Sequence, residues 1–132
     1  MKNYYYRKMS YNKLRVIISG GGTGGHIFPA ISIADKLMEL NPQTEILFVG
    51  AEGKMEMEKV PAAGYRIVGL PIVGLQRQLS FKNIVNDLKV PFKWLASQRK
   101  AAKVIREFRP DVAVGVGGYA SAPLLKQATR MH

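Results

Sequence analysis

The glycine-rich run at residues 20–25 constrains the fold more than any other part of the sequence. Five of these six residues are glycine, and the apolar, β-branched segment 14–19 comes directly before them. Such a segment is typical of a buried strand. Glycine in this density indicates that the backbone approaches another group closely. Because Pro29 fits the first turn of a helix, the sequence predicts a strand, a glycine-rich loop and then a helix.

Strand-like and helix-like segments alternate along the rest of the chain. Apolar segments predict three further strands, at 44–50, at 65–72 and within 109–118. Helices are predicted at 54–64, from 81 to 108 and from 121 to 132. Pro91 is expected to kink or split the long helix, and Ser121 is a candidate N-cap. The alternation predicts an α/β fold, in which a parallel sheet carries helices on both faces.

A second glycine pair follows the last predicted strand, in the sequence GVGGYAS. In an open parallel sheet, ligands bind at the carboxyl ends of the strands, where the strand order reverses. The first and last predicted strands are the expected neighbours at that point. Both end in glycine, and both lead into a helix N-terminus, where free N–H groups favour an anion. The two loops together predict a site for a phosphate or diphosphate.

Other interpretations of the first loop remain open at this stage. Gly20, Gly22 and Gly25 satisfy the GxGxxG spacing of a nicotinamide-dinucleotide site. Against that function, Glu52 lies slightly late for the ribose-binding acid, and HIFP is expected to separate the glycines from the helix. A Walker phosphate loop is excluded because no Lys-Ser/Thr pair follows the last glycine. The glycines could also serve only a tight turn.

His26 and Tyr119 stand at the edges of the two loops. A histidine beside a glycine turn is more often a structural hydrogen-bonding group than a catalyst. Here, however, it stands where a bound anion would lie, and imidazole is a competent base near neutral pH. Tyr119 is a candidate for ligand contact or for core packing.

Three segments resemble the MurG family of bacterial glycosyltransferases: GGTGGHIFPA (21–30), VPAAGY (60–65) and RPDVAVGVGGYAS (109–121). This family adds N-acetylglucosamine to lipid I, giving lipid II of peptidoglycan. The resemblance implies two Rossmann-like domains in the GT-B arrangement. Residues 14–132 match the N-terminal, acceptor-binding domain, after a basic, tyrosine-rich extension at 1–13. The C-terminal domain, which mainly binds UDP-N-acetylglucosamine, has no counterpart here, so the chain alone is expected to be inactive.

The same resemblance implies roles for particular residues. His26 matches the family's candidate for deprotonating the acceptor hydroxyl, in a direct displacement with inversion that needs no cofactor and no metal. Residues expected to bind substrate are Gly21, Gly22, Thr23, Gly24, Gly25, Gly117, Gly118, Tyr119 and Ser121. The expected substrates are lipid I and UDP-N-acetylglucosamine. An enzyme acting on lipid I is expected to lie on the cytoplasmic face of the plasma membrane.

The formal net charge of +11 is concentrated in segments 1–15 and 77–109. Such patches suit nucleic acid or acidic lipid. No nucleic-acid-binding motif is present, whereas 75–100 combines apolar, aromatic and basic residues as an interfacial helix does. Part of this stripe is expected in the core, at Val104, Ile105 and Phe108. Membrane contact is predicted for Leu79, Phe81, Lys82, Ile84, Leu88, Lys89, Phe92, Lys93 and Trp94.

Overall fold

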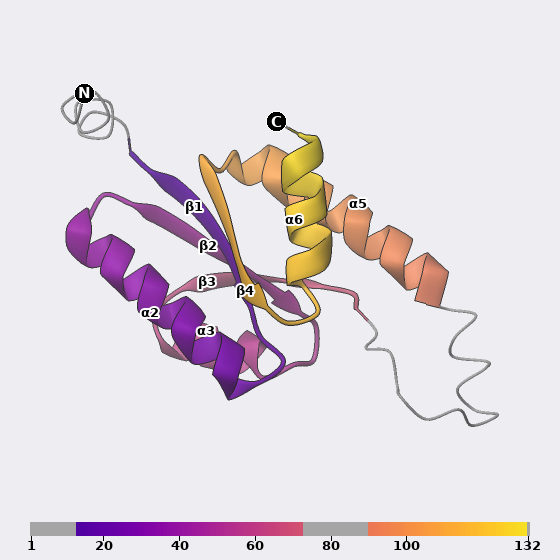
Figure 1. Cartoon of the computed structure of the whole chain (residues 1–132), viewed down its shortest axis with the longest axis horizontal. Helices are drawn as coiled ribbons and strands as arrows, with labels where there is room; N and C mark the ends of the chain where they lie inside the picture. The colour runs from indigo at the N-terminus through magenta and orange to yellow at the C-terminus, as the bar shows by residue number, and fades with distance from the viewer. Residues whose placement is uncertain (1–12, 73–89, 132) are drawn as a thin grey trace.

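The computed structural model describes residues 13–72 and 90–131. Within them, four parallel strands form one sheet in the order β3-β2-β1-β4 (Figure 1). The strands are β1 (Arg15–Gly20), β2 (Glu45–Ala51), β3 (Arg66–Leu70) and β4 (Val112–Gly117). All four predicted strands are confirmed, and so is the pairing of the first strand with the last. The strand order reverses between β1 and β4, and in open parallel sheets ligands bind outside the carboxyl ends of the strands at such a point.

Helices cover both faces of the sheet, as the α/β pattern predicts. α2 (Gly24–Leu40) and α3 (Glu56–Ala62) lie on one face, and α5 (Val90–Phe108) and α6 (Ser121–Arg130) lie on the other (Figure 1). Strand β1 shows why two layers form. Val16 and Ile18 pack toward α2, while Ile17 packs toward α5 and α6. Each of these side chains is almost fully buried, which contributes roughly 1.5–3 kcal/mol apiece.

The carboxyl half of α5 belongs to the core. Val104, Ile105 and Phe108 are buried in the cluster that also contains Ile17 of β1, as the sequence predicts. The described part of the helix runs from Val90, and Pro91 lies within it. The predicted helical segment before Val90 lies outside the described residues.

The predicted start of α2 is wrong. The helix begins at Gly24, within the glycine run, and Pro29 lies inside it rather than in its first turn. Proline removes one N–H and crowds the carbonyl four residues earlier. That carbonyl belongs to Gly25, in the first turn, so only one helical hydrogen bond is lost. The HIFP segment therefore does not separate the glycines from the helix. Its position is no longer an argument against a dinucleotide site.

Candidate functional site

The loops that follow β1 and β4 touch each other through their backbones. The Gly21 N–H donates to the Gly117 carbonyl at 3.3 Å. At Gly118, where φ is +95°, a Cβ atom would lie only 2.4 Å from the Gly21 carbonyl oxygen. This close approach is open only to glycine at position 118. The two predicted glycine loops therefore meet at the carboxyl edge of the sheet.

His26 lies at this junction, in the first turn of α2. Its Nδ1 is 3.0 Å from the Gly21 carbonyl oxygen and 3.4 Å from Thr23 Oγ1. On the other side of the ring, a Cβ atom at Gly117 would lie 2.7 Å from both Cδ2 and Nε2. The imidazole is thus held between the two loops and is only partly buried. A general base needs this combination of fixed orientation and access.

The start of α2 offers backbone donors to an anion. Thr23 is the N-cap, with extended backbone and no side-chain capping bond. Gly24 and Gly25 open the helix, and the first N–H groups of a helix have no acceptor within it. Thr23 and Gly25 are exposed, so a ligand can approach them. The helix dipole adds positive potential at the same place.

Tyr119 stands beside the mouth of this junction. Its side chain is 47% exposed, and its ring lies 4.0 Å from where a Cβ atom of Gly22 would stand. Lys54, in the loop between β2 and α3, places its Nζ 5.8 Å from the centre of the Tyr119 ring. The sequence interpretation did not include Lys54. Its position just after β2, on the carboxyl edge of the sheet, was the signal that could have found it.

Ser121 supports the second loop from inside the protein. Its hydroxyl is buried and donates to the Gly117 carbonyl at 2.9 Å. The hydroxyl also lies 3.2 Å from the carbonyl oxygen of Ser19. The predicted N-cap role is wrong, because Ala120 precedes the helix and no side-chain capping bond forms. Ser121 instead ties α6 and β4 to β1, so its predicted contact with substrate stays a prediction.

Glu56, which the sequence interpretation missed, lies directly beneath the first loop. This side chain of α3 is only 1% exposed. One carboxylate oxygen accepts the Gly22 N–H at 2.9 Å, and the other accepts the Ala51 N–H at 2.9 Å. Val60, one helical turn later, is also buried. The spacing of four residues between Glu56 and Val60 was the available signal for an inward-facing carboxylate.

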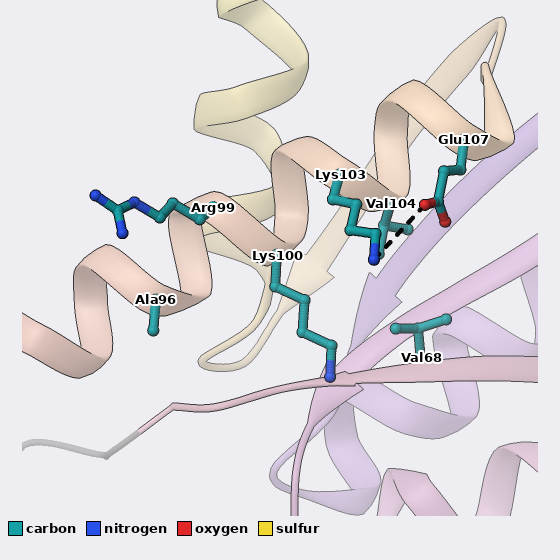
Figure 2. Close-up of a pocket in the computed structure, with 7 residues that line it drawn as sticks. All are labelled: Val68, Ala96, Arg99, Lys100, Lys103, Val104 and Glu107. Carbon is teal, nitrogen blue, oxygen red and sulfur yellow. Dashed lines mark ion pairs between the residues drawn. The ribbon is translucent and has the colours of Figure 1, made fainter.

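A basic groove lies apart from the glycine loops, between α5 and the edge strand β3 (Figure 2). Its volume is about 560 Å³, and its lining contains no residue of either loop. Val68 and Val104 supply apolar surface. Lys100 pairs with Glu52 at 3.1 Å, and Lys103 pairs with Glu107 at 3.8 Å. Arg99, on the same helix, extends away from this pair of lysines (Figure 2).

Three of the predicted membrane-contact residues fall on the described part of α5. Phe92 is 75% exposed, Trp94 is 41% exposed, and Lys93 is exposed between them. Lys126 of α6 lies 5.7 Å from the centre of the Trp94 ring. The other predicted contacts lie outside the described residues: Leu79, Phe81, Lys82, Ile84, Leu88 and Lys89. No helix among the described residues is long and apolar enough to cross a bilayer.

A comparison with protein-family models decides the family. Residues 16–132 match the glycosyltransferase family 28 N-terminal domain. The chain belongs to this family. The resemblance noted in the sequence is therefore confirmed at the level of the family.

Curated relatives of this family 28 chain carry one functional name. A protein from Bacteroides fragilis, 62% identical over 118 residues, is named UDP-N-acetylglucosamine–N-acetylmuramyl-(pentapeptide) pyrophosphoryl-undecaprenol N-acetylglucosamine transferase. The match covers 89% of this chain and 30% of the relative. A protein from Porphyromonas gingivalis with the same name is 63% identical over 116 residues, covering 88% of this chain and 30% of the relative. The chain thus spans about a third of these relatives.

A solved structure agrees with the fold of the family 28 domain. The crystal structure of Acinetobacter baumannii MurG aligns with a TM-score of 0.69, at 21% sequence identity. The alignment covers 91% of this chain and 33% of that protein. This likeness confirms the α/β fold expected for the N-terminal part of a two-domain glycosyltransferase.

Proposed function

We propose that this chain is the acceptor-binding part of an inverting glycosyltransferase. In this proposal, the whole enzyme transfers N-acetylglucosamine from UDP-N-acetylglucosamine to lipid I, the diphosphate-linked acceptor of peptidoglycan synthesis. The observation that carries it is the junction of the two glycine loops around His26. The names of relatives at about 60% identity support the choice of substrates.

Each part of the junction has a role in this reaction. The amides of Thr23, Gly24 and Gly25 suit a diphosphate, because backbone N–H groups bind it closely without side-chain bulk. His26 accepts the proton of the acceptor hydroxyl as that oxygen attacks the anomeric carbon of the donor sugar. The bond from that carbon to the diphosphate of UDP breaks on the opposite side, which inverts the configuration. The donor is held mainly by a second domain.

We also propose that α5 brings the acceptor site to an anionic membrane. Exposed Phe92 and Trp94 flank Lys93 near the start of this helix. Aromatic groups interleaved with lysine are typical of interfacial helices, and each basic group near an acidic surface contributes about 1 kcal/mol. This arrangement suits a peripheral enzyme on the cytoplasmic leaflet, where lipid I is accessible.

A backbone-amide titration followed by NMR tests acceptor binding. A short-chain, soluble lipid I analogue should shift the amide signals of Gly24, Gly25, Gly117 and Gly118. Inorganic diphosphate alone should shift the same signals more weakly, and NAD should not shift them. Shifts with NAD and none with the analogue would contradict the proposal.

A further inference from the structure

One peptide group, which joins Gly21 to Gly22, lies between Glu56 and His26. Its N–H donates to the Glu56 carboxylate at 2.9 Å. Its carbonyl oxygen lies 3.0 Å from His26 Nδ1. No cis peptide bond occurs in the described residues, and the N–H and C=O of a trans peptide point in opposite directions within one plane. Glu56 and His26 are therefore connected through a single rigid group.

This connection determines which nitrogen of His26 carries the proton in the neutral ring. A carbonyl oxygen accepts hydrogen bonds and cannot donate them. In the shorter of its two contacts, at 3.0 Å, Nδ1 is therefore the protonated nitrogen that donates to Gly21; the Thr23 hydroxyl lies farther away, at 3.4 Å. Nε2 is left with a free lone pair, on the edge of the ring that faces Gly117. That is the tautomer in which His26 can accept a proton in the crevice between the loops.

The Gly21–Gly22 peptide needs something to hold its orientation. Glycine on both sides offers little steric resistance to rotation of the peptide plane, and Gly22 has a φ of +83°. A reversed plane would point the Gly21 carbonyl at Glu56 and the Gly22 N–H at His26 Nδ1. It would therefore impose the opposite tautomer. An ionised carboxylate only accepts hydrogen bonds, so Glu56 opposes the reversed plane.

Glu56 is itself fixed in place. Its second oxygen accepts the Ala51 N–H at 2.9 Å, and the side chain is 1% exposed. A Cβ atom at Gly21 would lie 2.3 Å from its carboxyl carbon, and one at Gly50 would lie 2.5 Å from its Cγ. Backbone on two sides therefore confines the carboxylate. The bond from Ala51 and the contact with Gly50 anchor the carboxylate on β2, on the side away from the glycine loop.

We propose that Glu56 is a positioning residue that sets the tautomer of His26 through the Gly21–Gly22 peptide. The control of the tautomer stands on the geometry alone. The benefit to catalysis, a free Nε2 facing the acceptor hydroxyl, rests on the proposed function. Glu56 does not contact the substrate in this proposal and acts only through the backbone.

Nitrogen-15 NMR of the imidazole tests the first part in the unaltered chain. The sample is the 132-residue chain labelled uniformly with nitrogen-15 and carbon-13, at a pH where the ring is neutral. His132→Gln removes the second histidine and assigns the signals. We expect Nδ1 to be protonated in His26, and a hydrogen-bond coupling between the Gly22 nitrogen and the Glu56 carboxyl carbon. A ring protonated mainly on Nε2, or a Gly22 amide without that coupling, would overturn the proposal.

The variant Glu56→Gln tests the causal step. A glutamine at 56 has one acceptor oxygen for two N–H groups, so its NH₂ group faces one of them. Reversal of the Gly21–Gly22 peptide relieves that conflict and moves the His26 proton to Nε2. Loss of a charged hydrogen bond should change the tautomer ratio on the order of tenfold. Glu58→Gln, an exposed glutamate of the same helix, is the matched control and should change nothing.

The outcomes separate this proposal from the proposed function. A folded Glu56→Gln chain with the tautomer of the unaltered protein would overturn the control by Glu56, even if the loops bind the lipid I analogue. If Glu56→Gln changes the tautomer of His26 but the unaltered chain does not bind the lipid I analogue, the role of Glu56 is supported and the proposed function is contradicted. If Glu56→Gln does not fold, the coupling and tautomer of the unaltered chain decide the question.

Discussion

Gly118 lies so close to Gly21 that no side chain fits between them, because a Cβ atom at 118 would stand 2.4 Å from the Gly21 carbonyl oxygen. Two loops nearly a hundred residues apart in sequence thereby share one surface. Gly118→Ala should lower the free energy of unfolding by about 2–4 kcal/mol, through backbone strain and displacement of the first loop. Urea denaturation measures this change.

Gly53→Ala is the matched control for that substitution. Gly53 also has a positive φ, of +74°, but a Cβ atom there would meet nothing within 4 Å. Gly53→Ala should lower the free energy of unfolding by only about 1–2 kcal/mol, the strain of an alanine in left-handed backbone. If the two variants lose the same stability, the contact between the loops is not what requires glycine at 118.

His26 should be needed for sugar transfer and not for folding. The test enzyme is a chimera in which this chain replaces the matching N-terminal segment of the Bacteroides fragilis relative. His26→Gln should lower kcat by about 10²–10⁴-fold, the usual contribution of a general base. KM for the lipid I analogue should change little. Phe28→Gln, at an exposed side chain two residues later, provides the control for a change on the same helix. Transfer by His26→Gln at the rate of the parent chimera would exclude His26 as the base.

Stability should fall in alkaline solution because of Tyr65. Burial and the hydrogen bond to Asp35, 2.5 Å long, raise the pKa of Tyr65 to about 12. The unfolded chain has the ordinary tyrosine pKa of about 10. Between these values the folded state holds a proton that the unfolded state has lost, so stability decreases as pH rises. Below about pH 10 this contribution is fully present.

Urea midpoints measured across that pH window check the Tyr65 contribution. Tyr65→Phe should flatten the decline in midpoint between about pH 10 and the pKa of about 12. Tyr119→Phe, at an exposed ring beside the glycine loops, is the control and should retain the decline of the parent chain. An equal slope in Tyr65→Phe and the parent would assign the alkaline loss to other groups.

Membrane binding should depend on the basic residues around α5. Lys89→Glu combined with Lys93→Glu should weaken sedimentation with anionic vesicles by at least about thirtyfold, since each lost cation removes about 1 kcal/mol. Lys36→Glu combined with Lys59→Glu changes the charge equally on the opposite face of the sheet and should have a small effect. Equal losses in the two double variants would show that only net charge matters, and no loss in either would contradict the membrane proposal.

Local patterns were enough to predict the strands and the meeting of the two glycine loops. Buried strands require continuous apolar segments, and the alternation with helices leaves one parallel arrangement for β1 and β4. The start of α2 was missed because Gly24 and Gly25 have poor helix propensity. Both glycines are nevertheless helical, directly after the loop that follows β1. The prediction also assumed that Pro29 could lie only in the first turn of the helix, whereas it lies further inside.

Glu56 was missed because a single local cue pointed to it, the spacing of four residues to buried Val60. The residues around it include exposed Lys54, Glu58 and Lys59, as in any surface helix. The reason for its burial lies in two N–H groups, one from Gly22 in the first glycine loop and one from Ala51 at the end of β2. Only the folded sheet brings these donors to one point. The spacing to Val60 indicates that position 56 faces inward, but it does not indicate which donors a carboxylate would meet there.

The dependence of the first loop on Glu56 limits how the site can be moved or redesigned. A designer who transplanted GGTGGH with its flanking strand and helix would carry the visible motif but leave behind the carboxylate that orients it. The smallest portable unit is therefore discontinuous: β1, the loop and the start of α2, together with the end of β2 and α3. A substitution at Glu56 in α3 would therefore change the orientation of the Gly21–Gly22 peptide although the sequence GGTGGH itself stays the same.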